Sequence, residues 1–240
     1  MTLRVSLTPC WILHRRAWRE SSVILDALTR DHGRISLVAR GARRPRSSWR
    51  GLTEPFRALQ ASFSLRGEMG TLTGLEAGDG SPKLQGLALW CGFYVNELLI
   101  RLLPRQEPAP ELFDAYTGLL PKLADPEHRA PALRRFEMAV LYETGVAPDL
   151  TRDAKTGEPV AAGGWYRLVD ETGPVRTSGP GPESWEGQVF LALAGGQIGS
   201  KAVGKPGLQR DARKIMGRLL AFHLGDKPLY TRKLLDREES

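Results

Sequence analysis

The sequence predicts an α+β fold in which a small β-barrel precedes a mostly helical domain. Five short segments within the first 80 residues have the apolar alternation or apolar runs of strands. From Leu84 onward, apolar residues recur with the 3.6-residue spacing of helices. Residues 157–187 contain 11 Gly or Pro among 31 and predict an irregular insert. A chain of 240 residues that is 41% hydrophobic has enough apolar material for a core, which excludes wholesale disorder.

The predicted strands follow one another through tight turns. Gly33 is expected in one of these turns because glycine readily takes a positive φ. The segments are residues 11–14, as the start of a strand, and residues 22–29, 34–40, 59–65 and 69–75. Five short strands joined in this way are typical of a closed barrel or a meander, and the five-stranded option is an oligonucleotide-binding (OB) barrel.

Helices are expected over most of the remaining chain. The first runs from Leu84 to Leu103 and ends at Pro104, and the third opens at Pro131 in its first turn and ends at Gly145. The others are expected over residues 111–123, 188–193, 208–224 and 231–237. The composition shifts at residues 78–82, so the predicted domains are residues 1–80 and 81–240, with the irregular insert at about 151–187.

Positive charge is concentrated in the first third of the chain. The whole protein has a net charge of +7, and residues 1–80 contain 13 Arg, no Lys and seven acidic residues. The remaining 160 residues are close to neutral. This asymmetry favours a polyanionic partner for the first domain.

The densest functional signal is an arginine cluster at residues 40–50. Pro45 and the neighbouring serines argue against a helix, so an exposed loop between two strands is expected. Guanidinium groups that lack a local counter-charge are best accommodated against phosphates, and Trp49 offers a face for base stacking. The candidate phosphate contacts are Arg40, Arg43, Arg44, Arg46 and Arg50. The alternative is a solvated loop whose tryptophan packs back on the barrel.

A second group of arginines extends the same predicted surface. Arg15 and Arg16, with Arg19, are interleaved with Trp11 and Trp18. The alternative is that these tryptophans belong to the barrel core.

No catalytic or metal-binding constellation emerges from the sequence. The four His lack HExxH or HxH spacing, and Cys10 and Cys91 form no paired motif. Residues 195–201 resemble a phosphate loop only superficially, because the Gly-Lys-Ser/Thr ending is absent. A protein that acts by binding, without catalytic residues, metal or cofactor, is therefore expected.

A reducing cytoplasm is the expected location. Two unpaired cysteines fit such a compartment. The first apolar stretch is interrupted by His14, Arg15 and Arg16, so no signal peptide is expected, and no window is apolar enough for a membrane span.

A series of segments between residues 11 and 235 follows one order along nearly the whole chain. They are residues 23–43, LTEPF (52–56), RGEMGTL (66–72), YVNELLIRLL (94–103), LRRFE (133–137), TGEPV (156–160) and LGDKPL (224–229). As an ordered set they resemble the RecO family of bacterial DNA repair proteins.

The resemblance implies an N-terminal OB barrel, a helical domain and the role of a recombination mediator. Such a protein binds single- and double-stranded DNA, anneals complementary strands and, with its partner RecR, helps to load RecA onto strands coated by single-stranded DNA-binding protein (SSB). The resemblance also implies that the acidic C-terminal tail of SSB docks on the helical domain. Arg134 and Arg135 match the segment of the docking arginines, and their alternative reading is an ordinary pair on a helix surface. Participation of RecF, and of RecA only indirectly, is left open.

One departure from the family pattern concerns zinc. Some members carry four cysteines in the second domain, and residues 152–165 contain none. We therefore expect no metal, and an insert held by Trp165, Tyr166 and loop packing.

Three alternatives to a mediator remain at this point: a generic single-strand or RNA-binding OB module, an enzyme such as a nuclease with a dispersed site, and an adaptor whose basic loop meets an acidic protein.

Overall fold

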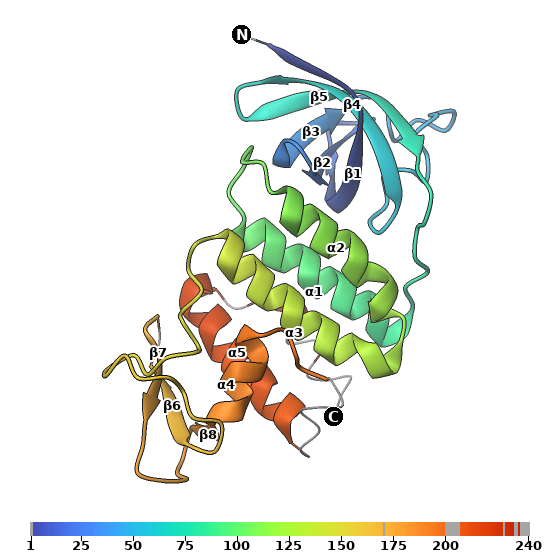
Figure 1. Cartoon of the computed structure of the whole chain (residues 1–240). Helices are drawn as coiled ribbons and strands as arrows, with labels where there is room; N and C mark the ends of the chain where they lie inside the picture. Colours follow the sequence, from blue (N-terminus) through green and yellow to red (C-terminus); the bar gives the residue numbers. More distant parts are fainter. Residues whose placement is uncertain (1, 170, 200–206, 228, 233–234, 236–240) are drawn as a thin grey trace. The chain divides into compact units, whose positions relative to one another are not determined.

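The computed structural model describes residues 2–169, 171–199, 207–227, 229–232 and 235. The chain divides into two compact units, one made of residues 1–124 with 229–240 and the other of residues 125–228 (Figure 1). The domain boundary predicted at residue 80 lies inside the first unit and stays a prediction. No helix in the described part of the chain is long and apolar enough to cross a membrane.

The first unit begins with a closed five-stranded barrel. Its strands are β1 (Leu3–Trp18), β2 (Ser22–Thr29), β3 (Gly33–Ala39), β4 (Ala58–Arg66) and β5 (Met69–Ala77). They are hydrogen-bonded in the order β1-β2-β3-β5-β4, and only β3 and β5 pair in parallel. The predicted α+β class with an N-terminal OB barrel is confirmed.

Apolar alternation builds the barrel core. In β4 every second residue is buried, and the inward side chains include Leu59 and Phe63. Strand β1 is much longer than predicted because it closes the barrel, pairing with β4 through its first half and with β2 through its second. Register shifts between Val5 and Thr8 and between Ile12 and His14 interrupt the alternation of buried and exposed residues in β1. For this reason the apolar pattern predicted only a short part of the strand.

Two predicted helices, α1 (Gly86–Leu102) and α2 (Pro110–Leu123), belong to the same unit as the barrel. Hydrogen bonds join these helices to β1 and to each other. The amide of Asn96 donates to the carbonyl of Leu13 at 2.8 Å, and the Tyr116 hydroxyl donates to Asn96 Oδ1 at 2.6 Å. Trp11 Nε1 donates to Thr117 Oγ1 at 2.9 Å, and Trp11 is only 4% exposed. Trp11 is therefore a core residue, as the alternative reading held.

The second unit contains α3 (Pro126–Glu143), α4 (Gly187–Ala194) and α5 (Leu208–Leu224), close to the predicted ranges except at the start of α3. That prediction was wrong by five residues, and Pro131 lies inside the helix. Asp125 supplies a side-chain cap to the amide of Glu127, and Pro126 occupies the first turn, so this pair outweighs Pro131 as a start signal. Of the helix predicted over residues 231–237, the described residues 231, 232 and 235 are helical and the rest lies outside the described residues.

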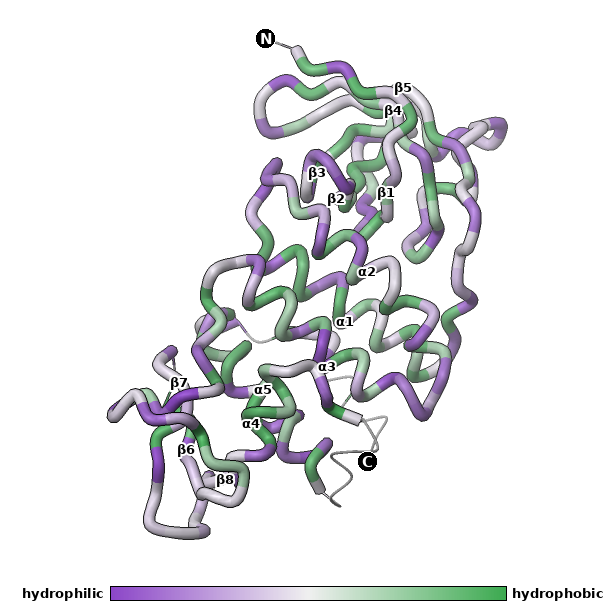
Figure 2. The backbone as a smooth tube through the Cα atoms, in the orientation of Figure 1, coloured by the Kyte–Doolittle hydropathy of each residue, from purple (hydrophilic) through white to green (hydrophobic). Residues whose placement is uncertain are grey.

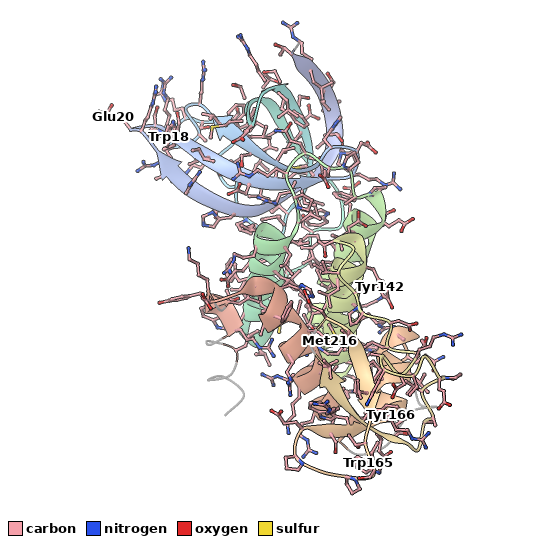
Figure 3. All side chains as sticks on the ribbon, turned by 90° about the vertical axis from the view of Figure 1, so that its left-hand side faces the viewer. Trp18, Glu20, Tyr142, Trp165, Tyr166 and Met216 are labelled. Atoms are coloured by element: carbon pink, nitrogen blue, oxygen red, sulfur yellow. The ribbon has the colours of Figure 1, made fainter. Side chains whose placement is uncertain are left out.

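The Gly/Pro-rich insert is more regular than predicted. It contains the antiparallel strands β6 (Trp165–Val169), β7 (Gly173–Arg176) and β8 (Ser184–Glu186), in the order β7-β6-β8. Strands of three to five residues are too short to display a clear alternation. Tyr166, labelled with Trp165 in Figure 3, is buried, accepts a hydrogen bond from the amide of Ala161 and packs edge-on against Phe190.

A buried carboxylate that the sequence analysis missed also holds the insert. Asp153 is 4% exposed, and its Oδ1 accepts hydrogen bonds from the amides of Lys155 and Thr156 at 2.8 and 2.9 Å. Its Oδ2 accepts from the amide of Arg176 at 2.6 Å, which joins the turn to β7. These bonds, led by the one from Arg176, hold the pKa of Asp153 below its usual range. One side chain thus ties together two segments that lie 23 residues apart.

Replacing Asp153 with alanine is expected to destabilise the insert by about 2–3 kcal/mol, because three backbone amides lose the charged acceptor that this buried side chain provides. Hydrogen exchange of the amides of residues 155, 156 and 176 measures this loss. Asp149→Ala is the control, since Asp149 is exposed and caps only Thr151. A depressed pKa means that the stabilisation is present above about pH 3.9 and is lost as the pH falls through the folded-state pKa. Equal protection in the two variants between pH 5 and 7 would contradict this role.

Candidate nucleic-acid interface

The predicted arginine cluster lies in the loop of residues 40–57 that joins β3 to β4, here named the arginine loop. Consecutive turns build its first half: the amides of Arg44, Ser47 and Arg50 donate to the carbonyls three residues earlier, at 3.0, 3.0 and 3.2 Å. Ala42 is buried in the barrel core, and Trp49 and Leu52 pack against that core. The loop is therefore an ordered structure pinned to the barrel by apolar side chains.

The five arginines of the predicted cluster, residues 40–50 of this loop, are all exposed to solvent. Arg40, Arg43, Arg44, Arg46 and Arg50 are exposed, and none of them forms an ion pair with a carboxylate of the described residues. Figure 2 shows hydrophilic stretches, drawn in purple, on the loops that connect the barrel strands. The loop thus presents five guanidinium groups to solvent, which is the arrangement that multiple phosphates require.

Trp49 exposes only part of its side chain to solvent. It is half-buried and packs against the barrel core, as the alternative reading expected. Its role in base stacking stays a prediction, and its observed contacts make it an anchor of the loop.

The arginine loop is tied to the turn between β1 and β2. The amide of Arg43 donates to the carbonyl of Ser21 at 2.9 Å, and Arg43 Nη1 donates to the carbonyl of Arg19 at 3.3 Å. This link places residues 18–22 beside the loop, and Figure 3 shows Trp18 and Glu20 at an outer edge of the barrel. Arg19 belongs to the second group of arginines that the sequence predicts to extend this surface, and Trp18 is interleaved with that group; contact of either residue with DNA stays a prediction.

The other two predicted contacts differ from each other. Arg16 is exposed. Arg15 is half-buried and ion-paired with Glu54 of the arginine loop, so its charge is partly neutralised. Of the two, Arg16 is the better placed for a phosphate.

Arg134 and Arg135 are neighbours on α3 that differ in exposure. Arg134 is 8% exposed and donates to the fully buried Glu137 at 2.8 Å. Arg135 is exposed, and the aliphatic part of its side chain lies beside Gly196, just after α4. Their role in binding the SSB tail stays a prediction, and only Arg135 presents its charge to solvent.

A histidine, an aspartate and a serine meet on the barrel without forming a catalytic triad. Ser36 Oγ donates directly to Asp26 at 2.6 Å, and His14 Nδ1 lies 3.8 Å from the other Asp26 oxygen. The carboxylate stands between the other two groups, whereas a triad requires the histidine there. Ser36 is also buried. Among the described residues, no group of three or more His, Cys, Asp or Glu is placed to hold a metal ion.

Nearly the whole chain is similar to known proteins. Residues 1–80 match the family described as Recombination protein O N terminal, and residues 84–233 match Recombination protein O C terminal. The chain is 42% identical to the DNA repair protein RecO of Nitrosococcus oceani, covering 98% of this chain and 94% of that protein. It is 44% identical to the DNA repair protein RecO of Alkalilimnicola ehrlichii, over 96% of this chain and 91% of that one. The chain belongs to the RecO family of DNA repair proteins.

Proposed function

We propose that the protein is a DNA-binding recombination mediator. It binds single- and double-stranded DNA, anneals complementary strands and, with RecR, assists the loading of RecA onto SSB-coated single strands. The observation that carries the proposal is the arginine loop, which is anchored to an OB barrel and whose residues 40–50 present five exposed guanidinium groups without a carboxylate partner among the described residues. Membership of a DNA repair family supports the same assignment.

Annealing follows from electrostatics without a catalytic group. A basic surface that holds two strands reduces the repulsion between their phosphates and raises their local concentration. Base pairing supplies the specificity, so neither ATP nor metal is needed. The protein works in the bacterial cytoplasm, at the nucleoid, where this DNA is found.

We place docking of the SSB tail on the helical unit, at Arg135. An exposed guanidinium next to the end of α4 suits an acidic peptide, whereas the Arg134–Glu137 pair is buried and supports α3 itself. RecR, and RecF if it takes part, are further proposed partners.

Annealing of two complementary oligonucleotides that are both coated with SSB tests the proposal, without nucleotide or metal. The protein is expected to anneal strands coated with intact SSB and to fail with SSB that lacks its C-terminal tail. Arg135→Ala is expected to slow only the annealing of SSB-coated strands, by about tenfold if the lost contact is worth about 1.4 kcal/mol. Arg167→Ala, which removes another exposed arginine of the same unit, is the matched control.

Each rival predicts a different outcome. Annealing of bare strands only would indicate a generic OB module and would overturn the mediator role. Metal-dependent cleavage of the strands would indicate a nuclease. Absence of any DNA binding, with binding to an acidic protein, would indicate an adaptor.

A further inference from the structure

We propose that the hollow between the β1–β2 turn and the arginine loop binds one unpaired nucleobase, stacked on Trp18, and that the site rejects paired bases. This inference rests on the proposed DNA binding and names the form of DNA that this part of the surface selects.

Trp18 is the most unusual aromatic residue of the barrel. It is 43% exposed, and it is the only exposed one of the chain's six tryptophans, all of which are described. An indole that stays in water does not contribute the stabilisation that burial of its apolar surface would give. Trp18 is nevertheless held in place, because it ends β1 and pairs with Ser22 at the start of β2. An indole fixed on a strand with its side open to solvent is a ready stacking platform.

The space next to Trp18 has the size of a small-ligand site. An open hollow of about 740 Å³ lies between residues 18–22 on one side and Val38, Arg40, Gly41 and Arg44 on the other. Its volume falls in the range of roughly 300–1,000 Å³ typical of sites for small organic groups. Ser21, Ser22, Val38 and Gly41 are small or short residues, which leave room for a planar base beside the indole.

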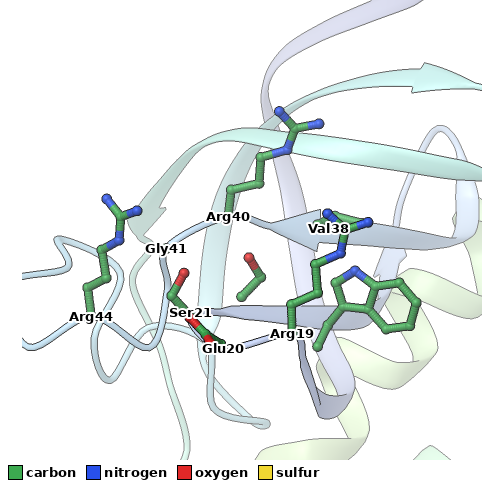
Figure 4. A pocket seen from close by; sticks show the side chains of 9 residues that line it. Arg19, Glu20, Ser21, Val38, Arg40, Gly41 and Arg44 are labelled. Atoms are coloured by element: carbon green, nitrogen blue, oxygen red, sulfur yellow. The ribbon is translucent and has the colours of Figure 1, made fainter.

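Charge around the hollow suits the phosphates on both sides of a stacked base. Figure 4 shows the side chains of Arg19, Arg40 and Arg44 extending from separate parts of the rim toward the same side. Glu20 also lines the hollow, so the local charge is about that of two cations rather than three. Two phosphates flank each internal nucleotide of a strand, and guanidinium groups bind them in a planar, two-pronged fashion.

The site is formed before any ligand arrives. Arg43 bridges its two walls through hydrogen bonds to the carbonyls of Ser21 and Arg19. Arg19 itself has a φ of 52°, a left-handed conformation that a residue other than glycine adopts only when its surroundings hold it. A preformed wall lowers the entropy that binding must overcome.

Only an unpaired base can use this site. In a duplex, both faces of an internal base are covered by its neighbours, so stacking on Trp18 would require a base to be pulled out at a cost of a few kcal/mol. Single strands expose their bases and stack on aromatic side chains regardless of sequence. When the base pairs with a complementary strand, it can no longer stack on Trp18. The annealed duplex therefore binds this site more weakly than the single strand does.

Equilibrium binding of the full chain to a labelled oligothymidine and to a duplex of equal length tests the proposal. Trp18→Leu is expected to weaken binding of the single strand by roughly 5- to 100-fold, the range for stacking of one base. Duplex affinity is expected to change less than twofold, and the salt dependence of both is expected to stay the same, because no phosphate contact is removed. Trp18→Phe, which keeps an aromatic face, is expected to restore most of the loss. Trp49→Leu, at the half-buried tryptophan, serves for comparison.

A second probe removes the base instead of the indole. The wild-type protein is expected to bind an abasic strand as weakly as Trp18→Leu binds the normal one, and the variant is expected not to distinguish the two strands. Equal losses on single strand and duplex, or a selective loss in Trp49→Leu alone, would overturn the inference while DNA binding stands. Loss of an acidic peptide's binding in Trp18→Leu, with single-strand binding intact, would also overturn it. If the wild type binds no DNA, the proposed function fails first.

Discussion

Replacing Arg43, Arg44 and Arg46 together with alanine is expected to weaken DNA binding on the order of 100-fold at low salt, taking about 1 kcal/mol for each phosphate contact. The slope of log affinity against log salt is expected to become shallower by roughly 2, at about 0.7–0.9 for each phosphate neutralised. All three side chains are exposed and none is in an ion pair with a described carboxylate, so their loss removes charge without breaking a salt bridge. Single-stranded and duplex DNA are both expected to lose affinity, because phosphate contacts do not read base pairing.

Fluorescence anisotropy at several salt concentrations measures both quantities. The matched control replaces Arg4, Arg66 and Arg105, which are exposed in the same unit but lie outside the arginine loop. It lowers the net charge by the same amount, so any general attraction falls equally in the two variants. An unchanged slope in the loop variant, or an equal change in the control, would place the DNA site elsewhere.

The largest effect on stability is expected from Gly33→Ala, which should lower the free energy of unfolding of the first unit by about 3–4 kcal/mol. Gly33 has a φ of 60°, a conformation that costs other residues about 1 kcal/mol. A Cβ at this position would also lie 1.7 Å from the backbone oxygen of Glu107, so one of the two segments must move.

That movement disturbs a buried connection between the barrel and the end of α1. The next residue, Arg34, donates two hydrogen bonds to the carbonyl of Leu103, at 2.9 and 2.8 Å, and accepts one from the amide of Gln106 at 2.9 Å. Arg34 is buried, so a guanidinium that loses these partners is left without compensation.

Urea unfolding of the two glycine variants separates backbone strain from the steric clash. Gly67→Ala is the control, since Gly67 has a φ of 68° and nothing lies within 4 Å of its missing Cβ. It is expected to cost only about 1 kcal/mol. If Gly33→Ala lowers the free energy of unfolding no more than Gly67→Ala does, the segment around Glu107 moves aside without loss of stability, and the contact does not stabilise the unit.

Local patterns predicted most of the fold. Strand β4 and helix α5 were found because the alternation of β4 and the 3.6-residue stripe of α5 are properties of one segment read alone. The three strands of the insert were missed because each is at most five residues long. The start of α3 was misplaced because two prolines lie five residues apart and only the first has an aspartate cap before it.

In the candidate interface too, some features could be predicted from local sequence and others could not. The charge of the arginine loop was visible in the sequence, because five arginines with no acid between them leave little choice but an exposed loop. The roles of the tryptophans were not. Trp11 and Trp18 lie on the same strand, yet the first is covered by Thr117 and Tyr116 of α2, and the second stays open.

The order of the barrel strands and of the helices, the concentration of positive charge in the first third and the family resemblance could all be predicted from the sequence, because each depends on neighbouring residues or on their order. Packing between distant segments buries Arg134 and leaves Arg135 exposed, and it places Trp18 at a hollow whose two walls Arg43 joins by hydrogen bonds. The same packing brings the backbone of Glu107 against Gly33. These outcomes depend on which distant segments pack against a residue, and no local pattern carries that information.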